Sequence, residues 1–260
     1  MTIPNLFSLA NLEPASGKRA QGYHRTRNLA VFASAELGWK NMLYLSATGR
    51  CDWASQLVSN GDVEGIFYPS IGLSGIISEM VKLPDFISYL KLRASYTEVG
   101  SPISQVGITP GTITHVINSG AIDPIGSFPY PDFKPERTKS YELGLNARFW
   151  DGRITFDGTI YQSNTYNQTF FSQLAFSTGY SGFYVQAGKV RNRGVEMTWG
   201  YNDKYGKVDY STHLTFTANK NKIQEMVHNQ INPIDGTSIS ITELSLQEAG
   251  GVYLREGYSM

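Results

Sequence analysis

A strict alternation of apolar and polar residues is the feature that most limits the folds open to this chain. On either side of Asp151-Gly152 every second residue is apolar or small: Leu143, Leu145, Ala147 and Phe149 before it, Ile154, Phe156, Gly158 and Ile160 after it. A period of two predicts strands with one apolar and one wet face, and Asp-Gly suits the positive φ angles of a two-residue type I′ turn. A hairpin closed there pairs Phe149 with Ile154, Ala147 with Phe156 and Leu143 with Ile160 on its apolar face. On its polar face it pairs Arg148 with Thr155 and Asn146 with Asp157.

The same pattern predicts six further strands. Val195, Met197, Trp199 and Tyr201 precede a break at 203–206, and Val208, Tyr210, Leu214 and Phe216 follow it. We therefore expect Tyr201 opposite Val208, Trp199 opposite Tyr210, and His213 beside Glu196 on the polar face. A third hairpin surrounds Gly38–Asn41, and strands at Phe67–Ile77 and Leu90–Val99 are joined by a connection with Pro84. Eight strands result.

The connections differ in length in a regular way. Long connections are expected at 51–65, 100–135 and 163–192, and short ones between them, so every long loop falls at one end of the sheet. Outer-membrane barrels have this asymmetry. Aromatic residues near strand ends fit the interfacial girdles of such a barrel: Trp39, Tyr44, Trp150, Tyr161, Trp199 and Tyr201. The alternative is a soluble β-sandwich with these rings in its core.

Composition excludes several other classes. Lys+Arg and Asp+Glu are both 22, so the net charge of +0 gives no electrostatic footprint for nucleic acid. No apolar run approaches the ~20 residues of a spanning helix. Cys51 is the only cysteine, which excludes an intramolecular disulfide and a thiolate metal cluster.

Catalytic patterns are weak. His24, His115, His213 and His228 are far apart in the sequence and form no metal-binding motif. We interpret His213 as a solvated side chain, with metal ligation as the alternative. The carboxylates of Glu142 and Asp157 share the polar face, as a general acid/base pair would require. They stand beside Asn146 and Arg148, however, and this mixture of polar and charged residues is typical of a hydrated wall. We expect neither catalysis nor a cofactor.

Aromatic residues are concentrated in the long connections together with Asn and Gln. Flat apolar rings beside amides suit glycan or peptide ligands, but these rings also fit packing of the loops against one another or against a partner. The candidates for contact are Phe128, Tyr130, Phe170, Phe171, Tyr180 and Tyr184.

Several blocks together resemble one protein family. The segment FKPERTKSYELG at 133–144 resembles a characteristic stretch of the SusC/RagA-type TonB-dependent outer-membrane transporters of the Bacteroidota. Other blocks follow in the family's order: Thr48–Asp52, Phe67–Ser70, Leu90–Tyr96, Arg193–Glu196, Ala218–Ile223 and Arg255–Met260.

The resemblance implies an all-β fold, an antiparallel up-and-down transmembrane β-barrel section of about eight strands from a barrel of ~22 strands around a plugged lumen. Residues 1–260 are expected to be a middle-to-late part of that barrel, without signal peptide, TonB box or plug. It also implies import across a Gram-negative outer membrane, an oligosaccharide or peptide substrate, a SusD-like surface lipoprotein partner, and TonB acting through the plug. Lumen-facing positions would be Glu142, Asn146, Arg148, Asp157, Glu196 and His213.

Two alternatives stay open at this point. One is a self-contained small outer-membrane barrel, because eight strands are enough to close around a side-chain-filled interior. The other is a soluble carbohydrate-binding β-domain.

Overall fold

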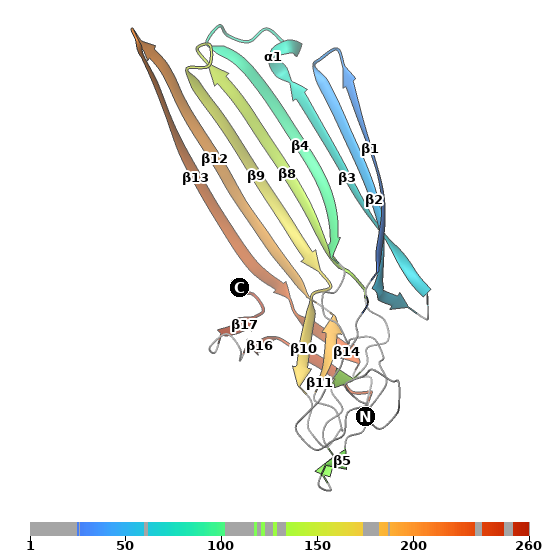
Figure 1. Cartoon of the computed structure of the whole chain (residues 1–260). Helices are drawn as coiled ribbons and strands as arrows, with labels where there is room; N and C mark the ends of the chain where they lie inside the picture. Colours follow the sequence, from blue (N-terminus) through green and yellow to red (C-terminus); the bar gives the residue numbers. More distant parts are fainter. Residues whose placement is uncertain are drawn as a thin grey trace, which may run out of the picture.

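Eight long strands form one antiparallel sheet in which every strand lies beside its neighbour in the chain (Figure 1). The structure, a computed structural model, describes residue 25 and residues 27–59, 62–101, 117–118, 121–122, 127–128, 134–173, 182–186, 188–231, 236–246 and 252–259. The strands of the sheet, in spatial order, are β1 (Asn28–Trp39), β2 (Leu43–Ser59), β3 (Asp62–Ile76), β4 (Ile87–Ser101), β8 (Glu136–Phe149), β9 (Ile154–Tyr166), β12 (Lys189–Tyr205) and β13 (Val208–Glu225). The predicted all-β, up-and-down sheet of eight strands is confirmed. Among the described residues β1 and β13 each pair on one side only, so the sheet is an open section and does not close into a small barrel.

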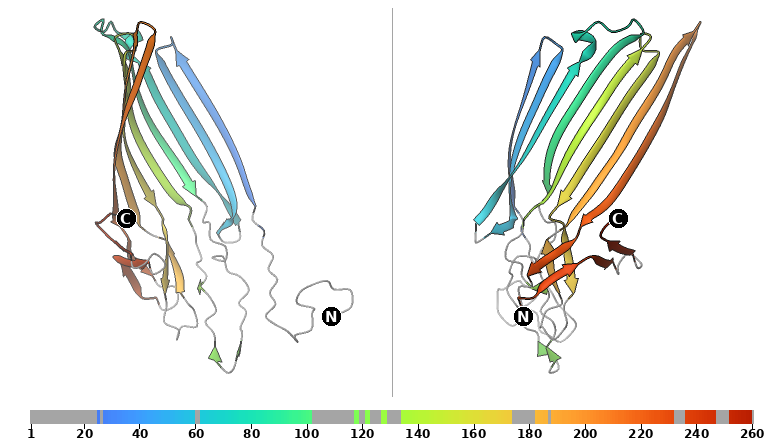
Figure 2. Two further views of the ribbon diagram at one scale, coloured as in Figure 1. Left: turned by 60° about the vertical axis from the view of Figure 1, so that its left-hand side comes forward. Right: turned by 180° about the vertical axis from the view of Figure 1, so that it is seen from behind.

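The two ends of the sheet are built differently (Figures 1 and 2). At one end, here called the turn end, β1–β2, β8–β9 and β12–β13 are joined by short turns, and the four-residue helix α1 (Ile77–Met80) begins the link from β3 to β4. The other end, the loop end, carries the remaining short strands. No helix in the described ranges is long and apolar enough to cross a membrane.

The register of β8 with β9 is the one predicted from the sequence. Phe149 lies opposite Ile154 and Asn146 opposite Asp157. The turn carries positive φ at Trp150, Asp151 and Gly152, which accounts for the Asp-Gly dipeptide.

The predicted register of β12 with β13 is wrong by four residues. The strands continue as far as Tyr205 and Val208, so Trp199 lies opposite Leu214, and His213 lies opposite Gly200 instead of beside Glu196. Because a shift of four is even, each side chain keeps the predicted face.

The prediction of a long loop at 51–65 is also wrong. β2 and β3 extend through this segment, and their ladder includes the pairs Cys51–Phe67, Trp53–Gly65 and Ser59–Asp62. The connection expected at 163–192 contains two strands, β10 (Thr169–Gln173) and β11 (Gly182–Gln186). In the segment 100–135, β5 (Ile117–Asn118), β6 (Ala121–Ile122) and β7 (Ser127–Phe128) are described.

The two faces of the sheet differ in chemistry. One rung of the ladder on the first face is entirely apolar, and it runs through Leu37, Leu45, Leu73, Ala94, Leu143, Ile160, Val195 and Ala218. We call this side the apolar face. Leu37 is 67% exposed, Leu143 52% and Leu214 66%, so no described part of the chain covers it. The opposite side, the polar face, carries Ser, Thr, Asn and charged residues.

The residues of the predicted aromatic girdle fall on both faces of the sheet. Trp39, Trp199 and Tyr201 belong to the register of the apolar face, and Trp150 lies in the turn after β8. Tyr44 and Tyr161 are wrong as girdle residues, because Tyr44 pairs with Ser74 and Tyr161 with Glu142 on the polar face.

A buried core lies at the loop end of β12 and β13. Val190, Ile223, Met226 and Leu254 pack together, each less than a tenth exposed, with Ile241 against them. These residues bring two small hairpins onto the sheet: β14 (Val227–Ile231) with β15 (Ser238–Ile241), and β16 (Glu243–Leu246) with β17 (Val252–Arg255). In the second hairpin the carboxylate of Glu243 accepts a hydrogen bond from Arg255 Nε at 2.8 Å and raises the pKa of Arg255.

Candidate functional site

An ion pair at the centre of the polar face joins β4 to β9. Arg93 donates from Nη1 to Asp157 Oδ2 at 3.1 Å and from Nη2 to Asp157 Oδ1 at 2.8 Å. Arg93 Nη2 also donates to Thr159 Oγ1 at 2.6 Å, and Asn146 Nδ2 donates to Asp157 Oδ2 at 2.8 Å. The bidentate geometry fixes the guanidinium and the carboxylate relative to each other. The network thereby ties three adjacent strands together across the polar face.

Gly144 makes this ion pair possible. It stands on β8 between Arg93 and Thr159, so the arginine must cross β8 to reach β9. A Cβ at Gly144 would meet Nε, Cγ and Cζ of Arg93. The missing side chain therefore opens the path along which Arg93 reaches Asp157.

A groove of about 280 Å³ lies beside the ion pair on the same part of the sheet. Its charged lining comes from three strands, with Glu36 on β1, Lys91 and Arg93 on β4, and Glu142 on β8. Together these side chains offer both signs of charge and several hydrogen-bonding groups to water or to a polar solute.

The structure brings some of the six predicted lumen-facing residues together and separates others. Asn146 and Asp157 belong to the Arg93 network, and Glu142 lines the groove next to it. Arg148 lies over the ring of Tyr89, 5.2 Å from its centroid, and does not enter the network.

Glu196 and His213 lie on the same face as that network, Glu196 next to its member Thr159 and His213 four residues of β12 away. Their register partners are Thr159 and Thr217 for Glu196, and Gly200 for His213. In the described part of the chain no three His, Cys, Asp or Glu side chains gather as a metal site would require.

Sequence reasoning missed Arg93, which is the centre of the site. The register of β4 against β8 depends on strands separated by residues 102–135, and no turn dipeptide fixes it. A signal was present, because Arg93 and Asp157 are oppositely charged residues on strands with clear alternation.

The aromatic candidates of the loop end fall mostly within one small sheet. The strands β10, β11 and β7 pair in that order. Phe171 lies opposite Tyr184 in the backbone register, Phe170 opposite Val185, and Phe128 opposite Phe183. Tyr184 is half-buried. Tyr130 and Tyr180 lie outside the described residues.

This small sheet is tied to the start of β8. The amide of Gln186 accepts from Lys134 N at 2.6 Å and donates to Lys134 O at 2.5 Å. Glu136 Oε1 accepts from Thr169 N at 3.2 Å, and Asn167 Nδ2 donates to Pro135 O at 3.3 Å. Residues 134–136, which belong to the FKPERTKSYELG segment, thus anchor the small sheet of β10, β11 and β7 to the start of β8.

Comparison with known proteins identifies the family. The family model described as TonB dependent receptor-like, beta-barrel, matches residues 4–256. The chain belongs to the TonB-dependent receptor β-barrel family. Among curated proteins, the receptor segment is similar to TonB-dependent receptors P26 and P39 of Formosa agariphila, at 24% identity over 229 residues and 25% over 241 residues.

The receptor segment spans about a quarter of these relatives. The two matches cover 84% and 89% of the segment but only 23% and 21% of the relatives. Among solved structures, it is similar to the RagAB peptide importer in its open-open state, with a TM-score of 0.74 and 19% identity over 96% of the segment and 27% of that chain. A second structure of the RagAB peptide transporter gives a TM-score of 0.72 and 19% identity, and covers 99% of the segment and 28% of that chain.

These similarities support the resemblance seen in the sequence. They place the eight-stranded sheet in the barrel of a TonB-dependent receptor, and members of this family are outer-membrane β-barrel proteins. The family is one of transporters and receptors and not an enzyme family.

Proposed function

We propose that the receptor segment forms part of the wall of an outer-membrane importer, with its apolar face toward lipid and its polar face toward the lumen. The observation that carries this proposal is the uncovered apolar face. Several large apolar side chains are half or more exposed along it, among them Leu37, Leu143, Ile160 and Leu214, whereas the polar face is cross-linked by Arg93 and Asp157. Such a division requires apolar solvent on one side only.

The height of the apolar face supports this orientation. On β8 the apolar register runs from Tyr141 to Phe149. At about 3.3 Å per residue this stretch measures about 26 Å along the strand, or about 20 Å along the membrane normal for a tilt of about 40°. This height approaches the ~25 Å apolar band of outer-membrane barrels.

The substrate of the whole importer is proposed to be an oligosaccharide or a peptide. The importer RagAB carries peptides by its name, and the aromatic residues near Asn and Gln suit either ligand. A SusD-like surface lipoprotein would cover the loop end, and TonB would act on a plug inside the complete barrel. The residues proposed for contact with substrate or lid are those of the small loop-end sheet: Phe128, Phe170, Phe171 and Tyr184, with Tyr130 and Tyr180 in the same connections.

Site-directed spin labels on adjacent residues test the orientation. Ile160→Cys and Thr159→Cys, each in the complete receptor with Cys51→Ser, place a label on opposite faces of β9. We expect the label at 160 to collide with oxygen, which concentrates in lipid, and the label at 159 to collide with a water-soluble nickel chelate. The same solvent profile at both positions would refute the proposal.

The substrate is tested in the organism that carries the receptor. Deletion of its gene should abolish growth on either oligosaccharides or peptides as sole carbon source and leave growth on monosaccharides and amino acids unchanged. Normal growth of the deletion strain on both polymer classes would contradict an importer of either substrate.

A further inference from the structure

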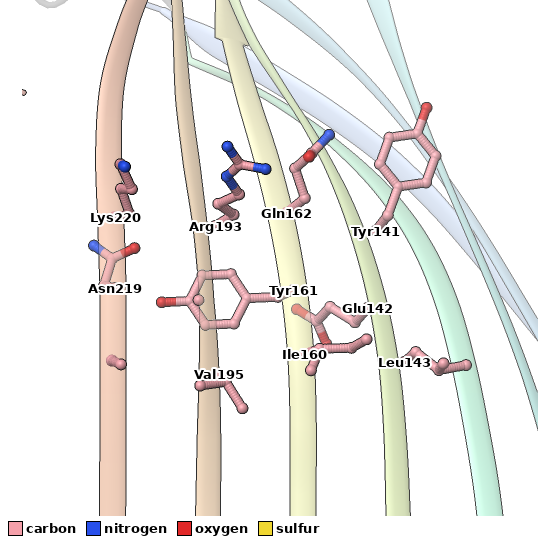
Figure 3. Close-up of a pocket in the computed structure, with 12 residues that line it drawn as sticks. Tyr141, Glu142, Leu143, Ile160, Tyr161, Gln162, Arg193, Val195, Asn219 and Lys220 are labelled. Carbon is pink, nitrogen blue, oxygen red and sulfur yellow. The ribbon is translucent and has the colours of Figure 1, made fainter. Parts of the chain in front are cut away.

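A groove of about 610 Å³ crosses four strands of the sheet near the loop end (Figure 3). Its lining takes three consecutive residues from each of β8, β9, β12 and β13. By register, two rows of side chains stand on the apolar face and flank the groove. The row nearer the turn end is Leu143, Ile160, Val195 and Ala218, and the row nearer the loop end is Tyr141, Gln162, Arg193 and Lys220.

The groove is therefore amphipathic. Figure 3 shows Leu143, Ile160 and Val195 in one row and Gln162, Arg193 and Lys220 in the other. The change from apolar to cationic occurs within one step of the ladder, about 7 Å along the strands. This step separates a surface suited to acyl chains from one suited to an anion.

Four cations stand together on β12 and β13 at this point. Arg193 is the register partner of Lys220, and Arg191 is the partner of Lys222 one step closer to the loop end. We call these four residues the basic cluster. Cross-strand partners have Cα atoms about 5 Å apart, so like charges are held side by side at a cost in free energy.

The described residues offer no acid to neutralise the basic cluster. Arg191 donates to the neutral side chains of Gln224 and Asn164, at 2.7 and 3.4 Å. Arg193, Lys220 and Lys222 are exposed, and no ion pair between described residues includes them.

The carboxylate in the same two rows of the ladder belongs to Glu98, which lies on β4. Arg137 Nη1 binds Glu98 Oε1 at 2.7 Å, and Lys139 Nζ lies 3.9 Å from Glu98 Oε2. Glu98 is 8% exposed and is thus already occupied by two cations. The basic cluster keeps its charge for an external anion.

We infer that this groove binds a phosphorylated glycolipid of the outer leaflet, with its phosphate on the basic cluster and an acyl chain along the apolar row. The inference rests on the proposed orientation of the apolar face toward lipid. Phosphate accepts charge-assisted hydrogen bonds from several donors at once, and cations at the loop-end edge of the apolar band attract anionic headgroups. A lipid satisfies both halves of the groove, whereas free phosphate satisfies only one.

The test measures lipid binding by the complete receptor, purified in detergent, using native mass spectrometry. The probes are diphosphorylated lipid A, the same lipid A without its phosphates, and inorganic phosphate as competitor. The double variant Arg193→Gln/Lys220→Gln removes two cations of the basic cluster. The control Lys82→Gln/Lys207→Gln removes two exposed cations at the turn end.

We expect the unmodified receptor to bind the phosphorylated lipid at least tenfold more tightly than the dephosphorylated one. Loss of two cations near the headgroup should weaken binding roughly thirtyfold, and the control should stay within about twofold. Equal binding of the two lipids to the unmodified receptor overturns the inference without any variant. Displacement of the lipid by equimolar phosphate also overturns it.

The spin-label experiment separates the two possible failures. If the label at 160 reports lipid and the two lipids bind equally, only the glycolipid site fails. If the label at 160 reports water, the orientation itself fails and the proposed function fails with it.

Discussion

Placing an arginine on the apolar face should destabilise the receptor according to the depth of the substituted residue. Ile160 lies six residues from Ile154 at the turn end of β9. This separation corresponds to about 20 Å along the strand and about 15 Å along the membrane normal at a tilt of about 40°. Ile160 is therefore close to the middle of a ~25 Å apolar band. We expect Ile160→Arg to reduce the free energy of unfolding by about 2–4 kcal/mol.

The same arithmetic ranks two neighbouring positions. Leu145 is four residues from Phe149, or about 10 Å along the membrane normal, and Phe156 is two residues from Ile154, or about 5 Å. Leu145→Arg should reduce the free energy of unfolding nearly as much as Ile160→Arg. Phe156→Arg should reduce it by only about 1 kcal/mol or less, because the introduced charge lies near the membrane interface.

The assay is guanidinium unfolding of the complete receptor in phosphatidylcholine vesicles, followed by tryptophan fluorescence. The control is Thr217→Arg, which adds the same charge on the polar face opposite Glu196 and should change stability by less than about 0.5 kcal/mol. If Ile160→Arg and Thr217→Arg cost the same, the apolar face does not meet lipid. If Phe156→Arg costs more than Ile160→Arg, the depth assignment is wrong.

Three further substitutions test local features by the same unfolding assay or by proteolysis. Gly144→Val should reduce the free energy of unfolding by about 1–3 kcal/mol by displacing Arg93. The loss should be smaller in an Arg93→Met background, because the side chain that crosses β8 is then uncharged and flexible. Equal losses in both backgrounds would argue against steric displacement of Arg93. Gly152→Ala should cost about 1 kcal/mol because φ is +87°, and unchanged stability would contradict the turn geometry. Met226→Ala should leave a cavity in the core at the loop end and cost about 2–5 kcal/mol of stability. The loosened core should make trypsin cleave faster at Arg255. Unchanged cleavage would show that this core does not hold the last two hairpins in place.

The strands were predictable from the sequence where a local signal determines their pairing. The Asp-Gly dipeptide and the alternation around it agree on one register for β8 and β9, and that register is the observed one. The segment 51–65 was misread as a loop even though Asn60-Gly61, between the paired Ser59 and Asp62, is a strong hairpin signal. The polar residues of this segment are typical of loops, but they also suit strands with one wet face.

The candidate site was less predictable because it depends on strands that are distant in the chain. Arg93 and Asp157 are 64 residues apart and meet across Gly144, a contact that no local turn specifies. The register of β12 with β13 failed for a related reason. The segment around Tyr205 contains turn-forming residues, yet the strands continue to its end. Alternation determined the face of each residue but left its partner open.

The sequential order of the strands has a consequence for how such a wall can change its circumference. Each of the eight strands pairs only with the strand before it and the strand after it among the described residues. Removing or duplicating one hairpin would alter the perimeter by two strands and leave every other pairing intact. The alternation of faces would also survive, because a hairpin returns the chain to the same end of the sheet. Pore width and wall chemistry are therefore separable properties in this architecture.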